Sequence, residues 1–271
     1  MWKGGKDTMD FPKKQRYNID DLLAIMRILR SDQGCPWDRE QTHQSIRKNM
    51  IEETYEVVEA IDTQDSVLLQ EELGDVLMQV VFHAQIEEEE HRFNFEDVCD
   101  GVCKKLIVRH PHVFSDVQVS DSAQVLTNWE SIKRSQKGQT SYTESLRSVP
   151  SVLPSLMRSE KVQSRAAKSG FDYPDLGWAM GDLKSEVGEL EEAIAYNNHE
   201  DIEEELGDLL FSCVNVARKA DVEPEYALTK SCEKFIERYA KVEQMSRERG
   251  IDMKTAGIDQ LNELWKEAKG K

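Results

Sequence analysis

The chain has 271 residues and a formal net charge of −17, which is enough length for one large or two small domains. The acidic excess argues against a nucleic-acid-binding protein, because phosphate backbones require stripes of Lys and Arg. Small phosphate ligands stay open, since a divalent cation can bridge carboxylates to phosphates.

Nothing in the sequence directs the chain to a membrane. Residues 1–17 are polar and basic, and we expect them to form a flexible extension rather than a signal peptide. No apolar run reaches the length of a membrane span. The five cysteines include no CxxC pair, which indicates reduced thiols and predicts a cytoplasmic protein.

Residues 18–136 are expected to form a first helical module. Apolar residues recur at spacings of three and four in two segments, which are Ile51, Tyr55, Val58 and Ile61, and then Leu73, Val76, Leu77, Val80, Val81 and Ala84. Asp65 is a suitable N-cap for the second segment. The short loop 62–66 therefore predicts an antiparallel helical hairpin.

Two pairs of acidic residues mark this hairpin. Glu53 and Glu56 are three residues apart, and so are Glu72 and Asp75, so each pair shares one face of its helix. Converging carboxylates repel one another unless they are protonated or bind cations, and Mg²⁺ prefers oxygen ligands. We expect a Mg²⁺ site here, with simple surface charge as the alternative. Gly74 is expected to let the two helices approach.

Basic residues follow on two further predicted helices. Lys105 and Arg109 are four residues apart, and so are Trp129 and Lys133. Lys and Arg can neutralise the charge of a triphosphate beyond what metals neutralise. The tryptophan either contacts a nucleotide or anchors its helix in the core.

A polar stretch with two prolines at 137–154 predicts a linker, and residues 155–271 repeat the first module. The heptapeptide EELGDVL at 71–77 returns as EELGDLL at 204–210, an offset of 204 − 71 = 133. The same offset, with small shifts later in the chain, gives the second set of candidate site residues: Glu186, Glu189, Glu205, Asp208, Lys234, Arg238, Trp265 and Lys269. The predicted fold is all-α, with two tandem helical-bundle modules that pack together or pair between chains.

The pattern EExxE followed by ExxD resembles the MazG family of all-α nucleoside triphosphate pyrophosphohydrolases. The resemblance extends to the stretches 34–38, 109–114 and 215–218. It implies Mg²⁺-dependent hydrolysis of NTPs or dNTPs at the α-phosphate to a monophosphate and pyrophosphate, and a homodimer.

Carried over by residue, the resemblance assigns roles to both modules. The metal ligands would be Glu53, Glu56, Glu72 and Asp75, and then Glu186, Glu189, Glu205 and Asp208. The nucleotide contacts would be Lys105, Arg109, Trp129 and Lys133, and then Glu204, Lys234, Arg238, Trp265 and Lys269. Glu52 would hold or activate the attacking water.

One departure leaves a second function open. Ser185 stands at the position of Glu52, so the second module has SExxE, although Glu204 could substitute. A nucleotide-sensing or interaction protein, with an unidentified protein partner, is therefore the alternative to an enzyme.

Three further patterns give weaker signals. Glu88-x-x-His91 matches a di-iron pattern but does not recur at the offset of 133, and His110-Pro111-His112 lacks further zinc ligands. Trp37-Asp38 and its counterpart Phe171-Asp172 either contact a base or serve as core packing with a helix cap.

Overall fold

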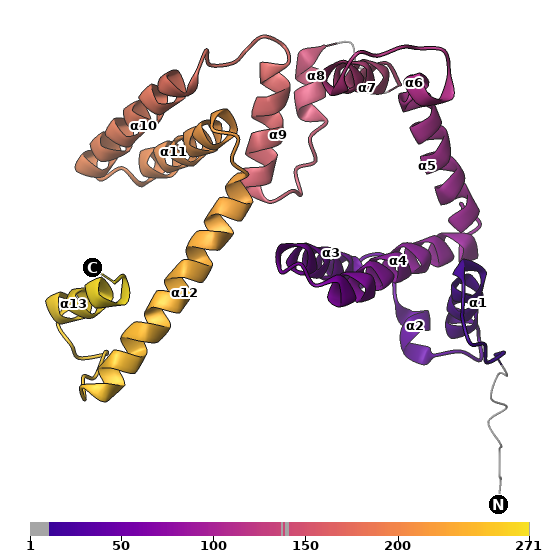
Figure 1. Ribbon diagram of the computed structural model, residues 1–271, viewed down its shortest axis with the longest axis horizontal. Coiled ribbons are helices and arrows are strands. Elements are labelled where there is room, and N and C mark those ends of the chain that lie inside the picture. Colours follow the sequence, from indigo (N-terminus) through magenta and orange to yellow (C-terminus); the bar gives the residue numbers. More distant parts are fainter. Residues whose placement is uncertain (1–10, 137, 139–140, 271) are drawn as a thin grey trace, which may run out of the picture. The chain divides into compact units, whose positions relative to one another are not determined.

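The computed structural model describes residues 11–136, 138 and 141–270, and these residues form helices and no strand (Figure 1). The all-α prediction is confirmed. The chain divides into two compact units, Met1–Ile132 and Lys133–Lys271, a few residues before the boundary that the sequence suggested.

The first unit is built on a long hairpin of two helices. Its elements are α1 (Ile19–Arg30), α2 (Pro36–Glu40), α3 (Arg47–Asp62), α4 (Ser66–Glu89), α5 (Phe95–Arg109), α6 (Pro111–Phe114) and most of α7 (Ser122–Gln136). Asp65 caps α4 by accepting hydrogen bonds from the amides of Val67 and Leu68, as predicted. Gln64 adopts a positive φ of 57°, which turns the chain between α3 and α4.

The core of this unit lies where α1 crosses the C-terminal half of α4. Met26, Ile46, Val81, Phe82 and Ile86 form one buried apolar cluster. Burying these side chains supplies the main stabilisation of the unit, because apolar burial contributes about 25 cal/mol per Å². Helix α4 packs most extensively on α3, and it also contacts α1 and α5.

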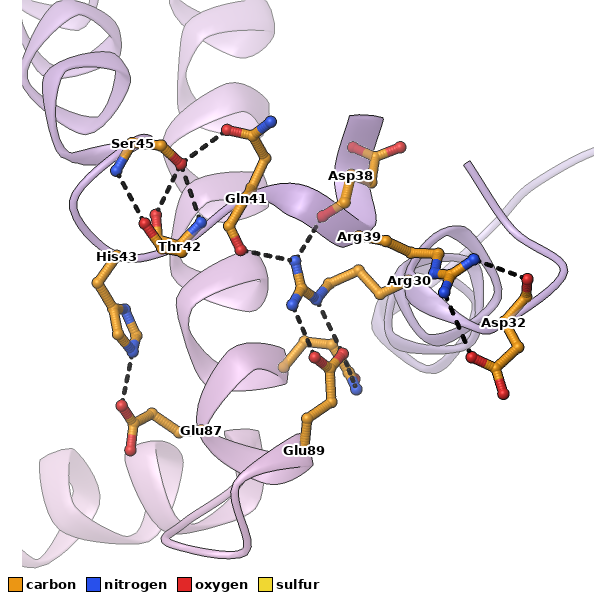
Figure 2. A network of polar contacts seen from close by, with 11 residues as sticks. Arg30, Asp32, Asp38, Arg39, Gln41, Thr42, His43, Ser45, Glu87 and Glu89 are labelled. Atoms are coloured by element: carbon orange, nitrogen blue, oxygen red, sulfur yellow. Dashed lines mark hydrogen bonds and ion pairs between the residues drawn. The ribbon is translucent and has the colours of Figure 1, made fainter. Parts of the chain in front are cut away.

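Arg30 joins three elements around this core (Figure 2). Its guanidinium donates to both carboxylate oxygens of Glu89, at 2.8 and 2.7 Å, and lies over the Phe82 ring. It also donates to the main-chain oxygens of Asp38 and Gln41. The segment that leads into α3 is therefore fixed to α1 and α4 by one nearly buried cation.

The second unit contains a hairpin of the same kind. Its elements are α8 (Tyr142–Arg147), α9 (Ser155–Ala167), α10 (Leu176–Tyr196), α11 (His199–Lys219), α12 (Pro224–Glu248) and α13 (Ile258–Ala268). Asn197 ends α10 with a left-handed φ of 54°, and Asn198 caps α11. Helix α9 packs on α11, and α13 packs on α12 around Val242, Leu264 and Ala268.

Two segments outside the hairpins contact neighbouring helices. The stretch expected to be a linker contains α8, which Arg165 of α9 holds by donating to the Ser145 carbonyl and to the Ser148 hydroxyl. Of the expected N-terminal extension, residues 1–10 lie outside the described part of the chain. Residues 11–17 are described, and Lys14 forms an ion pair with Asp21 of α1 at 2.5 Å.

Candidate active site

The first acidic cluster forms between α3 and α4. Carboxylate oxygens of Glu53, Glu56 and Glu72 all lie within 4.8 Å of one another, which is close enough to hold one metal ion. Glu53 and Glu56 project from one face of α3, and Glu72 projects from α4 and is buried. The helical spacing and the tight turn at Gln64–Asp65 thus bring together three of the four predicted ligands.

The fourth predicted ligand, Asp75, acts on this cluster electrostatically. Burial raises the pKa of Glu53, and contact with Glu56 and the nearby charge of Asp75 raise it further. Burial likewise raises the pKa of Glu72, with the charges of Glu56 and Asp75 as the next causes. The cluster therefore carries more negative charge than the protein neutralises by itself, which favours a bound cation.

Two neighbouring residues behave differently from the cluster. Glu52 is directed to Lys48 on the same helix, with an ion pair of 2.7 Å, and it does not join the three converging carboxylates. Gly74 was expected to allow close helix approach, but a Cβ built there meets nothing within 4 Å. The expectation for Gly74 is wrong, because its position on α4 faces open space.

The second unit repeats the arrangement between α10 and α11. Carboxylate oxygens of Glu186, Glu205 and Asp208 lie within 4.8 Å of one another. Burial raises the pKa of Glu186, and the charge of Glu189 raises it further. The pKa of Glu205 is raised by burial first and then by Glu189. All four carboxylates predicted from the repeat therefore interact.

The substitution of Ser185 for the first glutamate changes one contact. The Ser185 hydroxyl donates to a carboxylate oxygen of Glu189 at 3.0 Å, so it holds a member of the acidic group. Glu204 lies next to Glu205 on α11, and its charge contributes to the raised pKa of Glu205. Glu204 is thus an additional carboxylate beside the second cluster, as is Asp182, whose charge raises the pKa of Glu186.

The basic residues predicted for the first module lie in the C-terminal half of α5 and on α7. Arg109 places its guanidinium over the ring of Trp129 of α7, at 5.4 Å, and His110 packs edge-on against the same ring. Lys105 is exposed one turn earlier on α5, and Lys133 is half-buried on α7. Figure 1 shows α5 leaving the hairpin at the C-terminal end of α4, so Lys105 and Arg109 lie on a helix that departs from the acidic cluster of the same unit.

The basic residues of the second unit follow the same plan. Lys234 and Arg238 lie on α12, which extends away from the α10–α11 hairpin (Figure 1). Trp265 of α13 packs on Phe235 of α12, with ring centroids 5.2 Å apart, and the Lys269 ammonium lies over the Trp265 ring. Both tryptophans are half-buried, and each ring lies against one of the predicted cations.

A cavity of about 660 Å³ adjoins the second acidic cluster. Glu186 and Asp208 form part of its wall, and α9 and the turn after it form the opposite side. Gly170 has a φ of +90°, which favours glycine and turns the chain back over the cavity. The volume lies in the range of pockets that hold small organic ligands, about 300–1,000 Å³.

Phe171 and Asp172 line this cavity. Phe171 is 83% exposed and Trp37 is 59% exposed, so the core-packing alternative for these two aromatic residues is wrong. Asp172 forms ion pairs with Arg218 and Lys219 of α11 instead of capping a helix. Sequence reasoning gave no role to three further residues of the wall, which are Gln163, Asn215 and Arg218.

The iron and zinc alternatives gain no support from their surroundings. Glu88 pairs with Arg27 of α1, and His91 occupies the turn after α4 with a positive φ of 55°. His110 packs against Trp129 and its Nδ1 contacts the Leu106 carbonyl at 2.7 Å. These residues stabilise helix ends and contacts between helices.

Comparison with known proteins matches both hairpins to one family. Residues 41–114 and 179–243 each match the MazG nucleotide pyrophosphohydrolase domain. The two matched segments contain every carboxylate of the two acidic clusters.

Two relatives that this chain covers nearly end to end carry the pyrophosphohydrolase name, and a third is similar over about half of its own length. The chain is 43% identical over 254 residues to the nucleoside triphosphate pyrophosphohydrolase of Escherichia coli K12, which covers 93% of this chain and 97% of that protein. It is 42% identical over 252 residues to the nucleoside triphosphate pyrophosphohydrolase/pyrophosphatase MazG of Thermotoga maritima, with 93% and 96% covered. It is 45% identical over 254 residues to the uncharacterized protein YabN of Bacillus subtilis, covering 93% of this chain and 52% of that protein.

Proposed function

The chain belongs to the MazG nucleotide pyrophosphohydrolase family, and on that premise we propose that it hydrolyses nucleoside triphosphates at the α-phosphate, with Mg²⁺, to the monophosphate and pyrophosphate. The observation that carries the proposal is the pair of converging carboxylate clusters at matching positions of the two hairpins. An all-oxygen, highly acidic donor set suits a hard divalent cation that also binds phosphate oxygens.

The chemistry of the donor set fits Mg²⁺. Glu53, Glu56 and Glu72 would hold it with Asp75 in the first unit, and Glu186, Glu205 and Asp208 would hold it with Glu189 in the second. The raised pKa values of Glu53 and Glu186 arise partly from repulsion by neighbouring acids, which a cation relieves. When bound, the ion would bridge the carboxylates to phosphate oxygens and neutralise the charge that develops there.

The side chains of the protein would supply the other requirements. In the first unit Glu52 would orient a water toward the α-phosphorus, because its carboxylate is exposed and lies next to Glu53 of the cluster on α3. Glu204 is the corresponding candidate in the second unit. Lys and Arg side chains of α5 and α12 would stabilise the pyrophosphate that leaves.

We further propose that the chain acts as a homodimer. In each unit the basic residues lie on a helix that departs from the acidic hairpin, so a second copy could bring them over the cluster (Figure 1). Each hairpin also exposes large apolar side chains at matching positions, Leu73 and Leu77 in the first unit and Leu206 and Leu210 in the second. Exposed apolar surface of this kind is typical of interfaces.

Hydrolysis in ¹⁸O-labelled water tests the reaction. Attack at the α-phosphorus puts the label in the nucleoside monophosphate and leaves the pyrophosphate unlabelled. Chelation of Mg²⁺ should stop the formation of both products. Label found in pyrophosphate or in inorganic phosphate would refute cleavage at the α-phosphate.

We also propose a cytoplasmic location, because all five cysteines are free thiols.

A sensing role is the second candidate, and Ser185 favours it for the second unit. The Ser185 hydroxyl binds Glu189 and cannot act as a carboxylate base, so that site could retain nucleotide without turning it over. Binding of nucleotide with Mg²⁺ but without release of pyrophosphate would identify this role.

A further inference from the structure

Helix α10 carries one further carboxylate beside the second acidic cluster. Asp182 lies four residues before Glu186, so both side chains project from the same face of the helix. Both line the cavity of about 660 Å³, together with Asp208 of α11. Burial raises the pKa of Glu186 most, and the charge of Glu189 comes second. The charge of Asp182 comes next, ahead of the charge of Asp208, so Asp182 lies close to the cluster.

Two hydroxyl groups hold the Asp182 carboxylate in place. The Ser212 hydroxyl of α11 donates to its Oδ2 at 3.2 Å. The Tyr173 hydroxyl forms a hydrogen bond to the same side chain, and burial followed by this bond raises the pKa of Tyr173 to about 12, so the hydroxyl stays protonated. An ionised carboxylate has about four lone-pair sites. Asp182 is therefore fixed in orientation and keeps acceptor sites for a water molecule in the cavity.

The first unit has a different pair of residues at these positions. The offset 182 − 49 = 133 places Asn49 at the position of Asp182, and 185 − 52 = 133 places Glu52 at the position of Ser185. Each helix thus carries one carboxylate in this pair. Residues three apart share one side of a helix, so the exchange moves the carboxylate by about one turn and does not remove it.

The other candidate in the second unit, Glu204, is placed less favourably. It is exposed on α11, and it does not belong to the described residues that line the cavity. Asp182 lines that cavity and also a neighbouring open cavity of about 650 Å³ whose wall includes Ser185. Asp182 therefore lies between the position that corresponds to Glu52 and the carboxylates of the cluster.

We propose, on the basis of the proposed function, that Asp182 holds the attacking water in the second unit and so takes the part of Glu52, whose position Ser185 occupies. The water oxygen forms a bond to the α-phosphorus, and the bond from that phosphorus to the α,β-bridging oxygen breaks. Pyrophosphate leaves with the electron pair of the broken bond, and a proton of the water passes to Asp182 and then to solvent. The second unit is then catalytic, although it has SExxE.

Pyrophosphate release by the full chain tests this role, with Glu53→Gln included throughout so that the second unit reports. Asp182→Asn keeps the shape of the side chain and one acceptor but is no base, so kcat should fall about hundredfold while KM changes by less than about threefold. Adding Ser185→Glu to Asp182→Asn copies the pair of the first unit and should raise kcat again by about tenfold or more. Glu192→Gln, an exposed acid on α10, serves as the control and should leave kcat unchanged.

Binding measurements separate a water-holding role from a structural one. Calorimetric titration with Mg²⁺ and an α,β-imido nucleoside triphosphate should give the same affinity for Asp182→Asn as for its parent, and circular dichroism should show that both are folded. A loss of affinity equal to the loss of rate would show that Asp182 positions the ligands, and it would overturn the proposal. Unchanged kcat in Asp182→Asn, or no recovery on adding Ser185→Glu, would overturn it as well. The same holds if Glu204→Gln abolishes turnover and Asp182→Asn does not.

Failure of this role is distinguishable from failure of the proposed function. If the wild-type chain releases pyrophosphate and the Glu53→Gln chain does not, the second unit is idle, so the role of Asp182 is refuted and the proposed function stands. Absence of pyrophosphate release from any NTP by the wild-type chain would refute the proposed function itself.

Discussion

Glu87 shows how single residues hold the first unit together. Its carboxylate contacts the ring of His43 at 2.6 Å (Figure 2) and accepts from Arg92 at 2.5 and 2.9 Å. His43 also contacts His83 at 2.7 Å. The hydrogen bond from Arg92 is the main cause that lowers the pKa of Glu87 to about 2, and the bond from His43 adds to it. His43 precedes α3, so this contact ties the start of the acidic hairpin to α4.

The lowered pKa predicts a pH-dependent stability. Because the folded pKa lies below the ordinary value of 4.5, ionised Glu87 stabilises the fold above that pH and loses its contribution as the pH falls toward 2. The difference in unfolding free energy between wild type and Glu87→Gln should therefore shrink between about pH 5 and pH 3. Denaturant titrations at both pH values measure it, with the exposed Glu40→Gln as control. A difference that grows toward acid would contradict the assignment.

At the residue scale, the sequence predicted which carboxylates converge, but it did not predict the residues that line the cavity. Glu53, Glu56 and Glu72 could be predicted to converge, because helical spacing fixes which side chains share a face. Gln163 and Asn215 come from helices far apart in the chain, and their meeting depends on how α9 packs on α11. No local spacing carries that information.

At the scale of elements, the turn between α3 and α4 sets the geometry of the cluster. Asp65 caps α4 with two hydrogen bonds, and removal of such a cap costs about 1 kcal/mol. Asp65→Ala should therefore lower the thermal midpoint of the first unit and weaken its metal binding, while Asp62→Ala, which makes no such cap, should not. Differential scanning calorimetry with and without Mg²⁺ measures both effects. Equal behaviour of the two variants would show that the turn is held by other contacts.

The helices themselves were predictable, and their directions were not. Apolar periodicity and the Asp65 cap located the hairpin, because both signals are local. The course of α5 and α12 away from their hairpins depends on tertiary contacts at Phe95 and at the start of α12. Lys105 and Lys234 were correctly expected on helices, but nothing in the sequence showed that those helices leave the acidic cluster of their own chain.

At the scale of the whole molecule, the repeat predicts that both hairpins contribute in the same way to a homodimer. If the exposed apolar faces of both hairpins pair with a second copy, the chain should sediment at twice its 31.2 kDa mass. The double change Leu77→Asp and Leu210→Asp places a charge at matching positions of both hairpins and should yield monomers. Val152→Asp, at an exposed loop position, should leave the dimer intact. A wild-type chain that sediments as a monomer at micromolar concentration would contradict the dimer.

The internal repeat made the twin hairpins predictable from the sequence, but it did not predict every wall of the site. A constant offset over two helices and their loop predicted twin hairpins, and the two family matches and the two carboxylate clusters agree with it. The repeat does not carry over to every wall of the site, since Phe82 and Asn215 occupy matching positions with different roles. Sequence duplication thus conserved the acidic clusters while the space beside them diverged.

The most direct test of the account is pyrophosphate release from a panel of NTPs and dNTPs with Mg²⁺. Wild type should release pyrophosphate, and the double variant Glu53→Gln with Glu186→Gln should be about a hundredfold slower or more, because one ligand of each proposed metal site is neutralised. The single variants assign the activity to one unit or to both, and Glu192→Gln, an exposed acid on α10, serves as the control. Wild-type turnover that persists unchanged in the double variant would contradict the carboxylate sites, and binding without any release would contradict the enzyme.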